Sequence, residues 1–280
     1  MAAAASQPPR FSCVSCHAPT PTLYRRFGTA GSSSCTIKLT RCTKCRQVVD
    51  HYIEVGALLV LIDLVLHRPQ AYRHVLFNRP SSSRMPAVPR KLVVMAFYTA
   101  FIDALVQYIT ASMTTDLMPS DAGLLLVTDT NWLFVFLTAA LEHVAFNGAA
   151  LALCRARLPS FDVGRGYLAL LFPMLFKCTA VVLFVWDEHA TILVVVMLMV
   201  LSCQQLALSE VLGKGGLRQG GGSASVFSAG VIAFATCLRL AARLTCIYAA
   251  AGSQGGASSG VYAVYAAGLP ASPLLLRALT

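Results

Sequence analysis

Charged residues are scarce in this chain. Asp, Glu, Lys and Arg make up 12% of its 280 residues, whereas hydrophobic residues make up 56%. Soluble globular domains carry about 25% charged residues. The scarcity argues against a soluble enzyme or binding domain and predicts a membrane protein.

The first residues also lack the features of a secretory signal peptide. Four alanines are followed by Ser6, Gln7 and two prolines, so the apolar stretch of about 7–15 residues that such a peptide needs does not form. We expect residues 1–10 to be a disordered lead. Membrane insertion is then expected to depend on internal apolar segments.

The ten cysteines do not follow the pattern of a disulfide-rich domain. Cysteine in an apolar segment behaves as a small hydrophobic residue. Five cysteines lie in or beside such segments: Cys154, Cys178, Cys203, Cys237 and Cys246. Four others form two C-x-x-C pairs, Cys13 with Cys16 and Cys42 with Cys45, and twenty-five residues separate the pairs.

Two facing C-x-x-C pairs supply four thiolates at about 2.3 Å in the tetrahedral arrangement that suits structural Zn²⁺. A redox pair or a disulfide is the alternative, but no βαβ pattern surrounds either pair. We expect residues 11–50 to form a zinc ribbon with a hairpin, Leu23–Phe27 against Thr36–Thr40. Cys35 and His17 are interpreted as a spare thiol and an exposed histidine.

Beyond the second pair, the segments VDHYIE and QAYRHVLFN resemble the signature of the Arv family. The resemblance covers about a quarter of the chain. It implies a zinc-ribbon membrane protein of the endoplasmic reticulum that handles sterols, sphingolipids and glycolipids. Apart from the four cysteines, the matching residues are Asp50, Tyr52, Ile53, Glu54, Gln70, Ala71, Tyr72, Arg73, His74, Leu76, Phe77 and Asn78.

Residues 51–91 are predicted to be an interfacial helix followed by a basic linker. The apolar segment 55–67 spans about 20 Å as a helix, short of the ~30 Å hydrocarbon core, and Asp63 interrupts it. We expect it to lie in the membrane surface. Burial of this helix against the ribbon is the alternative.

Five later segments are long enough to span a bilayer: 92–111, 132–153, 167–186, 190–212 and 226–250. The sequence therefore predicts a mostly α polytopic membrane protein with a small N-terminal β zinc ribbon. The spans form a transmembrane bundle over 92–250, and residues 251–280 form a tail.

Loop charges predict the orientation of these spans. Thirteen Lys or Arg against three acids precede Leu92, the next loop carries only acids, and the sign alternates through the following loops. By the positive-inside rule the ribbon faces the cytosol. A spanning helix at 55–67 would instead place the ribbon in the lumen and remove this consistency.

A strip of polar residues after the short helix is predicted to lie at the membrane surface. Arginine binds phosphate bidentately, so the strip is a hypothetical site for a lipid headgroup or a partner. The alternative is that Arg73 and His74 pin the interfacial helix to the first span. The strip consists of Arg68, Tyr72, Arg73, His74 and Asn78.

Ionisable residues also fall near the middle of four spans, where a lipid-facing charge is costly. We expect them to face inward and pair across helices, with Pro173 opening the third span near Lys177. One hypothesis is that this row of paired charges binds a lipid headgroup. The alternative is that the pairs only fix how the helices assemble. The residues of this row are Asp103, Glu142, His143, Lys177 and Arg239. A membrane enzyme that uses His143 is a further alternative.

The preferred function follows from the resemblance. It is a non-enzymatic role in lipid homeostasis at the endoplasmic reticulum, in sterol distribution and in glycolipid, GPI-precursor or sphingolipid supply. The partners are then membrane lipids. A regulatory subunit of a lipid-synthesising enzyme is the alternative, and an enzyme in its own right is a third. Nucleic acid is not expected, because the positive charge flanks membrane spans and the ribbon lacks a row of aromatic residues for base stacking.

Overall fold

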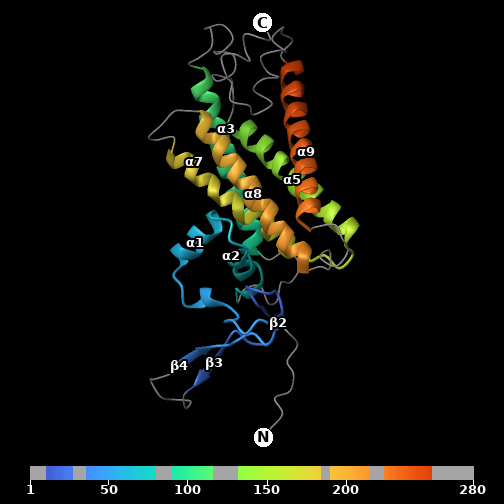
Figure 1. Ribbon diagram of the computed structural model, residues 1–280. Coiled ribbons are helices and arrows are strands. Elements are labelled where there is room, and N and C mark those ends of the chain that lie inside the picture. The colour runs from blue at the N-terminus through green and yellow to red at the C-terminus, as the bar shows by residue number, and fades with distance from the viewer. Residues whose placement is uncertain are drawn as a thin grey trace.

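The computed structural model describes residues 11–27, 36–79, 90–115, 132–183, 190–214 and 224–253. A small β unit occupies one end of the molecule, and a bundle of long helices occupies the other (Figure 1). The predicted lead, Cys35, the acidic loops and residues 254–280 lie outside the described residues. The fold class predicted from the sequence is confirmed.

The β unit consists of two antiparallel hairpins. β1 (Phe11–Ser12) pairs with β2 (Pro19–Thr20), and β3 (Tyr24–Phe27) pairs with β4 (Thr36–Leu39). A bridge between Arg41 and Val48 closes the second cysteine loop. A small core of Cys13, Leu23, Cys42 and Val49 fills the centre. This core is too small to be stable without a cross-link or a metal.

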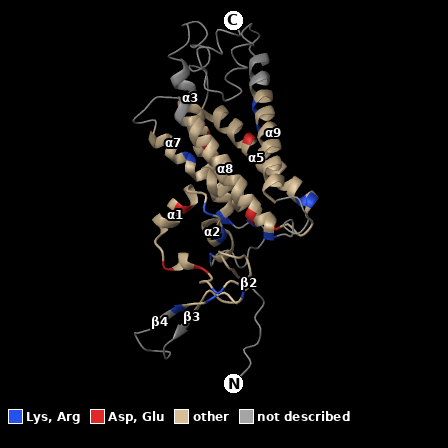
Figure 2. Ribbon diagram, viewed as in Figure 1, with Lys and Arg blue, Asp and Glu red and all other residues tan. Residues whose placement is uncertain are grey.

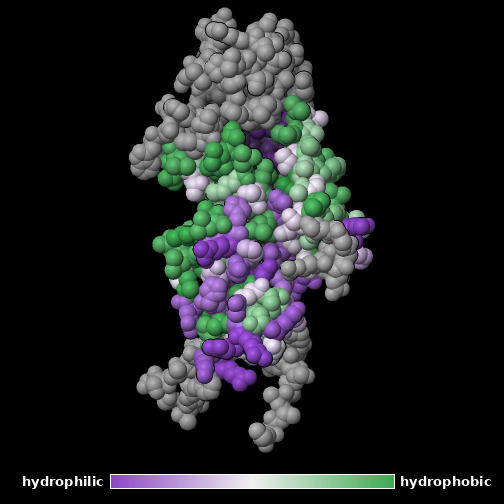
Figure 3. Space-filling model, in the orientation of Figure 1, coloured by the Kyte–Doolittle hydropathy of each residue, from purple (hydrophilic) through white to green (hydrophobic). Residues whose placement is uncertain are grey.

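Three short helices follow the β unit: η1 (His51–Ile53), α1 (Ala57–Val65) and α2 (Pro69–Arg73), which continues into the π-helical turn η2 (His74–Asn78). The nine residues of α1 reach only about 14 Å, so it cannot span a bilayer. Leu64 is its buried residue, whereas Leu58, Leu59 and Ile62 are exposed. Hydrophobic residues also cover much of the visible face of the molecule (Figure 3). The exposure of these α1 residues favours the membrane surface over burial against the ribbon.

Within the part of the chain that the structure describes, five helical stretches are long and apolar enough to cross a membrane. Four are the helices α3 (Arg90–Thr115), α5 (Trp132–Arg157), α8 (Ala190–Lys214) and α9 (Ala224–Ser253). Helix α5 packs against α3 and α9, and α8 packs against α9. Acidic and basic residues occur along the helices of this bundle (Figure 2).

The third span is interrupted and begins earlier than predicted. It runs from α6 (Val163–Leu171) through the 3₁₀ segment η4 (Phe172–Lys177) to α7 (Cys178–Leu183). Proline lacks a backbone N–H, so Pro173 accounts for the change of helix type. The start lies at Val163 because Asp162 caps the helix by accepting a hydrogen bond from the backbone N–H of Arg165 at 3.1 Å.

Candidate functional site

The sulfur atoms of the four ribbon cysteines meet at one point. All lie within 4.8 Å of one another. Cys13 Sγ is 3.7 Å from Cys45 Sγ, and Cys16 Sγ is 3.6 Å from Cys42 Sγ. A disulfide requires about 2.05 Å, whereas a tetrahedral metal with sulfur bonds of about 2.3 Å separates its ligands by about 3.8 Å. The four cysteines therefore fit a metal ion and not a disulfide.

The two cysteine loops have the same backbone geometry. The N–H of His17 donates to the carbonyl of Cys13 at 2.9 Å, and the N–H of Arg46 donates to that of Cys42 at 3.0 Å. His17 and Arg46 both have positive φ, 64° and 62°. Each turn thereby folds back and directs two thiols to the same side. The side chain at the positive-φ position differs, and only His17 reaches the membrane helices.

The surroundings of the thiols prepare the site for a metal. Burial raises the pKa of Cys13 to about 12 despite the backbone N–H groups of Cys16 and Ser15. Burial also opposes ionisation of Cys42, but the backbone N–H groups of Cys45 and Lys44 outweigh it and lower its pKa to about 7. Ionisation is thus easier at Cys42 than at Cys13. A metal binds the thiolate form, so metal binding displaces the remaining protons.

Arg73 and Glu210 join the ribbon to the membrane helices. Nε and Nη2 of Arg73, at the end of α2, donate to the two carboxylate oxygens of Glu210 in α8 at 2.7 and 3.1 Å. Nη1 of Arg73 donates to the carbonyls of Val14 and Ser15, inside the first cysteine loop, at 2.7 and 2.9 Å. His17 Nε2 lies 3.0 Å from Glu210. One carboxylate thus holds α2 and a metal loop against α8.

Asp50 is the second centre of this contact. It is fully buried, and its carboxylate accepts from the backbone N–H of Tyr52 at 3.0 Å and from Asn78 Nδ2 at 2.7 Å. His74 Nδ1 lies 2.7 Å from the same carboxylate. Asn78 also exchanges hydrogen bonds with the backbone of Ser12 at 2.8 and 2.9 Å. We call the whole set the ribbon joint: His17, Asp50, Arg73, His74, Asn78 and Glu210.

Most members of the predicted headgroup strip are buried or engaged by protein atoms. Tyr72 and Asn78 are each 1% exposed, and the three guanidinium nitrogens of Arg73 are all engaged by protein oxygens. His74 is held by Asp50. The alternative, in which Arg73 and His74 hold parts of the protein together, is closer to the structure. These residues hold the ribbon against the fourth span, however, whereas the alternative had them hold the short helix against the first span.

Arg68 is the exception, since its side chain is 60% exposed and lies 3.4 Å from Asp63. It lines a polar hollow of about 470 Å³ between the ribbon and α2, together with His51, Gln47 and Gln70. Arg68 is therefore the one member of the strip that stays open to solvent and ligands.

The structure brings all five predicted intramembrane residues together. Lys177 of η4 donates to Asp103 of α3. Arg239 of α9 donates to Asp103 at 3.3 Å and to Glu142 of α5 at 3.0 Å. The ion pairs therefore cross four spans. We call these residues, with His143, the intramembrane network.

His143 lies beside this cluster. Its Nε2 is 3.2 Å from the Thr99 hydroxyl, and its Nδ1 is 3.9 Å from Asp103. Sequence reasoning missed Thr99 and two partners of Glu142: Gln107, which donates at 3.2 Å, and Arg243, at 3.6 Å. The signal for Arg243 was its position one turn after Arg239. Arg243 leaves the cluster with one more cation than acid.

This chain is similar to known proteins of one family. The model of the Arv1-like family matches residues 12–208. The chain is 43% identical to a protein arv1 homolog of Dictyostelium discoideum over 32% of this chain and 37% of that protein. It is 37% identical to the human Protein ARV1 over 27% of this chain and 26% of that protein.

A third relative, Protein ARV1 of Saccharomyces cerevisiae, is 39% identical over 24% of this chain and 19% of its own length. Each of these alignments thus spans well under two thirds of the relative. No solved structure matches the chain. The family model nevertheless covers more than half of the chain, from the ribbon to the fourth span, and on this basis the chain belongs to the Arv1-like family.

Proposed function

We propose that this chain is a non-enzymatic membrane protein of lipid homeostasis in the endoplasmic reticulum. It acts in the distribution of sterols and in the supply of glycolipids, GPI precursors or sphingolipids. Membership of the Arv1-like family carries this proposal. The supporting structural observation is the ribbon joint, because it fixes a metal-binding unit to a bundle of membrane helices.

The metal is proposed to be Zn²⁺ in a structural role. Four thiolates suit zinc and leave no open coordination position for substrate. Cys13, Cys16, Cys42 and Cys45 would hold it, and its chemistry there is to cross-link the two cysteine loops. The small ribbon core explains why a cross-link is needed.

The membrane orientation proposed from the charges places the ribbon in the cytosol. The exposed leucines of α1 then enter the cytosolic leaflet, while exposed Arg68 lies at headgroup level beside the polar hollow. We retain Arg68 alone as a headgroup contact. A helix of this kind binds a bilayer through its apolar face and stays in the interface.

A non-catalytic role suits the position of His143. It is 4% exposed and packs between Thr99 and Asp103 within the intramembrane network. A histidine in such a position contributes to helix assembly. A catalytic histidine has to reach a substrate within hydrogen-bonding distance.

Native mass spectrometry of the purified full-length protein tests the proposal, since one spectrum reports bound metal and co-purified lipid. We expect one zinc per chain and retained sterol or glycolipid. Loss of the zinc in Cys42→Ser, with full zinc in Cys237→Ser, is the expected control, because Cys237 is an exposed cysteine of α9. A stoichiometric enzyme partner without retained lipid would favour the regulatory subunit, and turnover that is lost in His143→Gln would favour the enzyme.

A further inference from the structure

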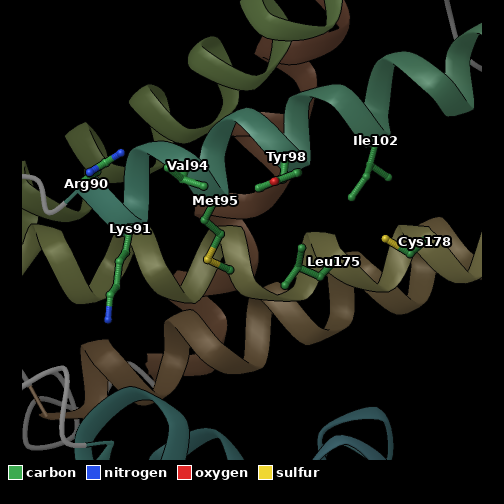
Figure 4. Close-up of a pocket in the computed structure, with 8 residues that line it drawn as sticks. All are labelled: Arg90, Lys91, Val94, Met95, Tyr98, Ile102, Leu175 and Cys178. Carbon is green, nitrogen blue, oxygen red and sulfur yellow. The ribbon is translucent and has the colours of Figure 1, made fainter.

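An apolar groove runs along the first span, where α3 lies beside the interrupted third span. Its volume is about 670 Å³. Val94, Met95 and Ile102 of α3 form one wall, and Leu175 of η4 and Cys178 of α7 form the other. Figure 4 shows these side chains along the two facing segments. The volume is within the range of small-molecule sites in proteins.

The two ends of the groove differ in charge. Arg90 and Lys91 line one end, at the start of α3, and Ile102 and Cys178 line the other (Figure 4). Both cations are exposed. Among the residues that the structure describes, neither forms an ion pair with an acid. The groove therefore offers two unneutralised cations at one end of an apolar channel.

The length of the groove matches one leaflet of a bilayer. Arg90 and Ile102 are twelve residues apart on a continuous helix, which corresponds to about 18 Å. Half of the hydrocarbon core is about 15 Å thick. Ile102 precedes Asp103 and Cys178 follows Lys177, so the ion pair of these two residues ties the walls together at the deep end.

We propose that this groove binds one anionic phospholipid from the leaflet on the ribbon side. Its phosphate lies at Arg90 and Lys91, which donate charge-assisted hydrogen bonds, and one acyl chain lies along Val94, Met95 and Leu175. A sterol is less suited, because its single neutral hydroxyl leaves both cations without a counter-charge. The inference rests on the proposed function and goes beyond it, because it names a further lipid class and a site for it.

Photolabelling in vesicles tests the site directly. Full-length protein is reconstituted in phosphatidylcholine vesicles that contain a trace of a lipid with a photoactivatable acyl chain, either phosphatidylinositol or phosphatidylcholine. We expect the phosphatidylinositol analogue to label the peptides that contain Met95 and Cys178 more strongly than the phosphatidylcholine analogue. Equal labelling by the two analogues would overturn the proposal, as would stronger labelling of these peptides by a photoactivatable cholesterol.

Charge variants examine the headgroup end. The double variant Arg90→Gln with Lys91→Gln is expected to weaken labelling by the anionic analogue. Each cation that is removed should lower the labelling by a factor of about five. The matched control is Arg155→Gln with Arg157→Gln, which removes two charges from the same side of the bundle and is expected to leave labelling unchanged. A comparable loss in the control would mean attraction by the surface as a whole and would overturn the site.

Steric variants examine the acyl-chain end. Val94→Trp places a bulky ring in the groove, whereas Val93→Trp places the same ring on a neighbouring position that does not line it; the two valines are 45% and 55% exposed. We expect Val94→Trp to abolish groove labelling and Val93→Trp to keep it. Unchanged labelling in Val94→Trp would overturn the groove. The proposed function would survive that result if lipid still co-purified, and it would fail only if none did.

Discussion

The ribbon joint and the intramembrane network both bury charged side chains, but they satisfy them to different degrees. In the joint, every guanidinium nitrogen of Arg73 donates to a protein oxygen. The Asp50 carboxylate accepts from Tyr52 and Asn78, and also from His74 when Nδ1 of His74 carries a proton. In the network, Glu142 Oε1 and His143 Nδ1 have no hydrogen-bond partner among the described residues. The joint therefore fixes one geometry, while the network leaves polar atoms without partners and so leaves room for rearrangement.

The joint and the network differ because their hydrogen-bond partners belong to different parts of the protein. Several joint contacts go to backbone atoms, as Arg73 does with Val14 and Ser15, and a backbone carbonyl lies at a fixed place. The network joins side chains of separate helices, whose relative positions depend on packing. Hydrogen bonds to the backbone thus give the joint its rigidity.

The largest expected effect is on the ribbon alone and leaves the intramembrane network intact. Cys42→Ser removes one metal ligand and should unfold the ribbon, because a structural metal contributes on the order of 10 kcal/mol to such a unit. Hydrogen exchange should become fast across residues 11–50 while α5 stays protected, since the network does not include the ribbon. Protection of the ribbon equal to that of Cys237→Ser would contradict the metal site.

The next largest effect breaks the joint without touching the metal ligands. Glu210→Ala leaves Arg73 buried and unpaired, so we expect a loss of about 3–5 kcal/mol in ribbon docking, measured by denaturant titration with a fluorophore on the ribbon. The double variant Arg73→Met with Glu210→Leu should lose less. Ser209→Ala is the control, because among the described residues this hydroxyl donates to the carbonyl of Leu206 in its own helix. A control as damaging as Glu210→Ala would refute the joint.

Breaking the network should cost somewhat less. Asp103→Asn leaves Lys177 and Arg239 short of one negative charge, and an unpaired charge within the bilayer costs about 2.5–3.5 kcal/mol. Asp103→Lys should be worse alone and partly rescued by Lys177→Glu, read as the melting temperature of the purified protein. The pairing is disproved if Lys177→Glu gives no rescue.

The smallest effect compares the two cysteine loops. Arg46→Gly should stabilise the metal-bound ribbon by up to about 1 kcal/mol, because glycine adopts positive φ without strain. His17→Gly gains the same backbone relief but loses the contact with Glu210. The melting temperature of Arg46→Gly should therefore be higher than that of His17→Gly. The reverse order would mean that His17 does not support the joint.

Local patterns made the ribbon and the spans predictable from the sequence. The C-x-x-C pairs lie close along the chain, and a metal fixes their geometry whatever surrounds them. Apolar length gives the number of spans, because a bilayer has a set thickness. The start of the third span was misplaced because Asp162 caps a helix whose first turn is not strongly apolar.

The joint was not predictable because its key partner is distant. Glu210 lies 137 residues after Arg73, and nothing in the sequence near either residue shows that they meet. An arginine in a basic segment suggests phosphate binding as readily as an ion pair. The network was easier to predict, since charges inside apolar spans have few alternatives to one another.

The distance between Arg73 and Glu210 also sets an order of events during synthesis. Translation proceeds at about 5–20 residues per second, so roughly ten seconds separate the appearance of the two residues at the ribosome. The ribbon can bind its metal as soon as Cys45 has emerged from the ribosome. Its partner Glu210 in the fourth span is synthesised only later. During that interval Arg73 is free to interact with anionic headgroups or with the insertion machinery. A chain that stops before Glu210 would keep the contacts of Asn78 with the ribbon but would lack the ion pair that ties Arg73 to the fourth span.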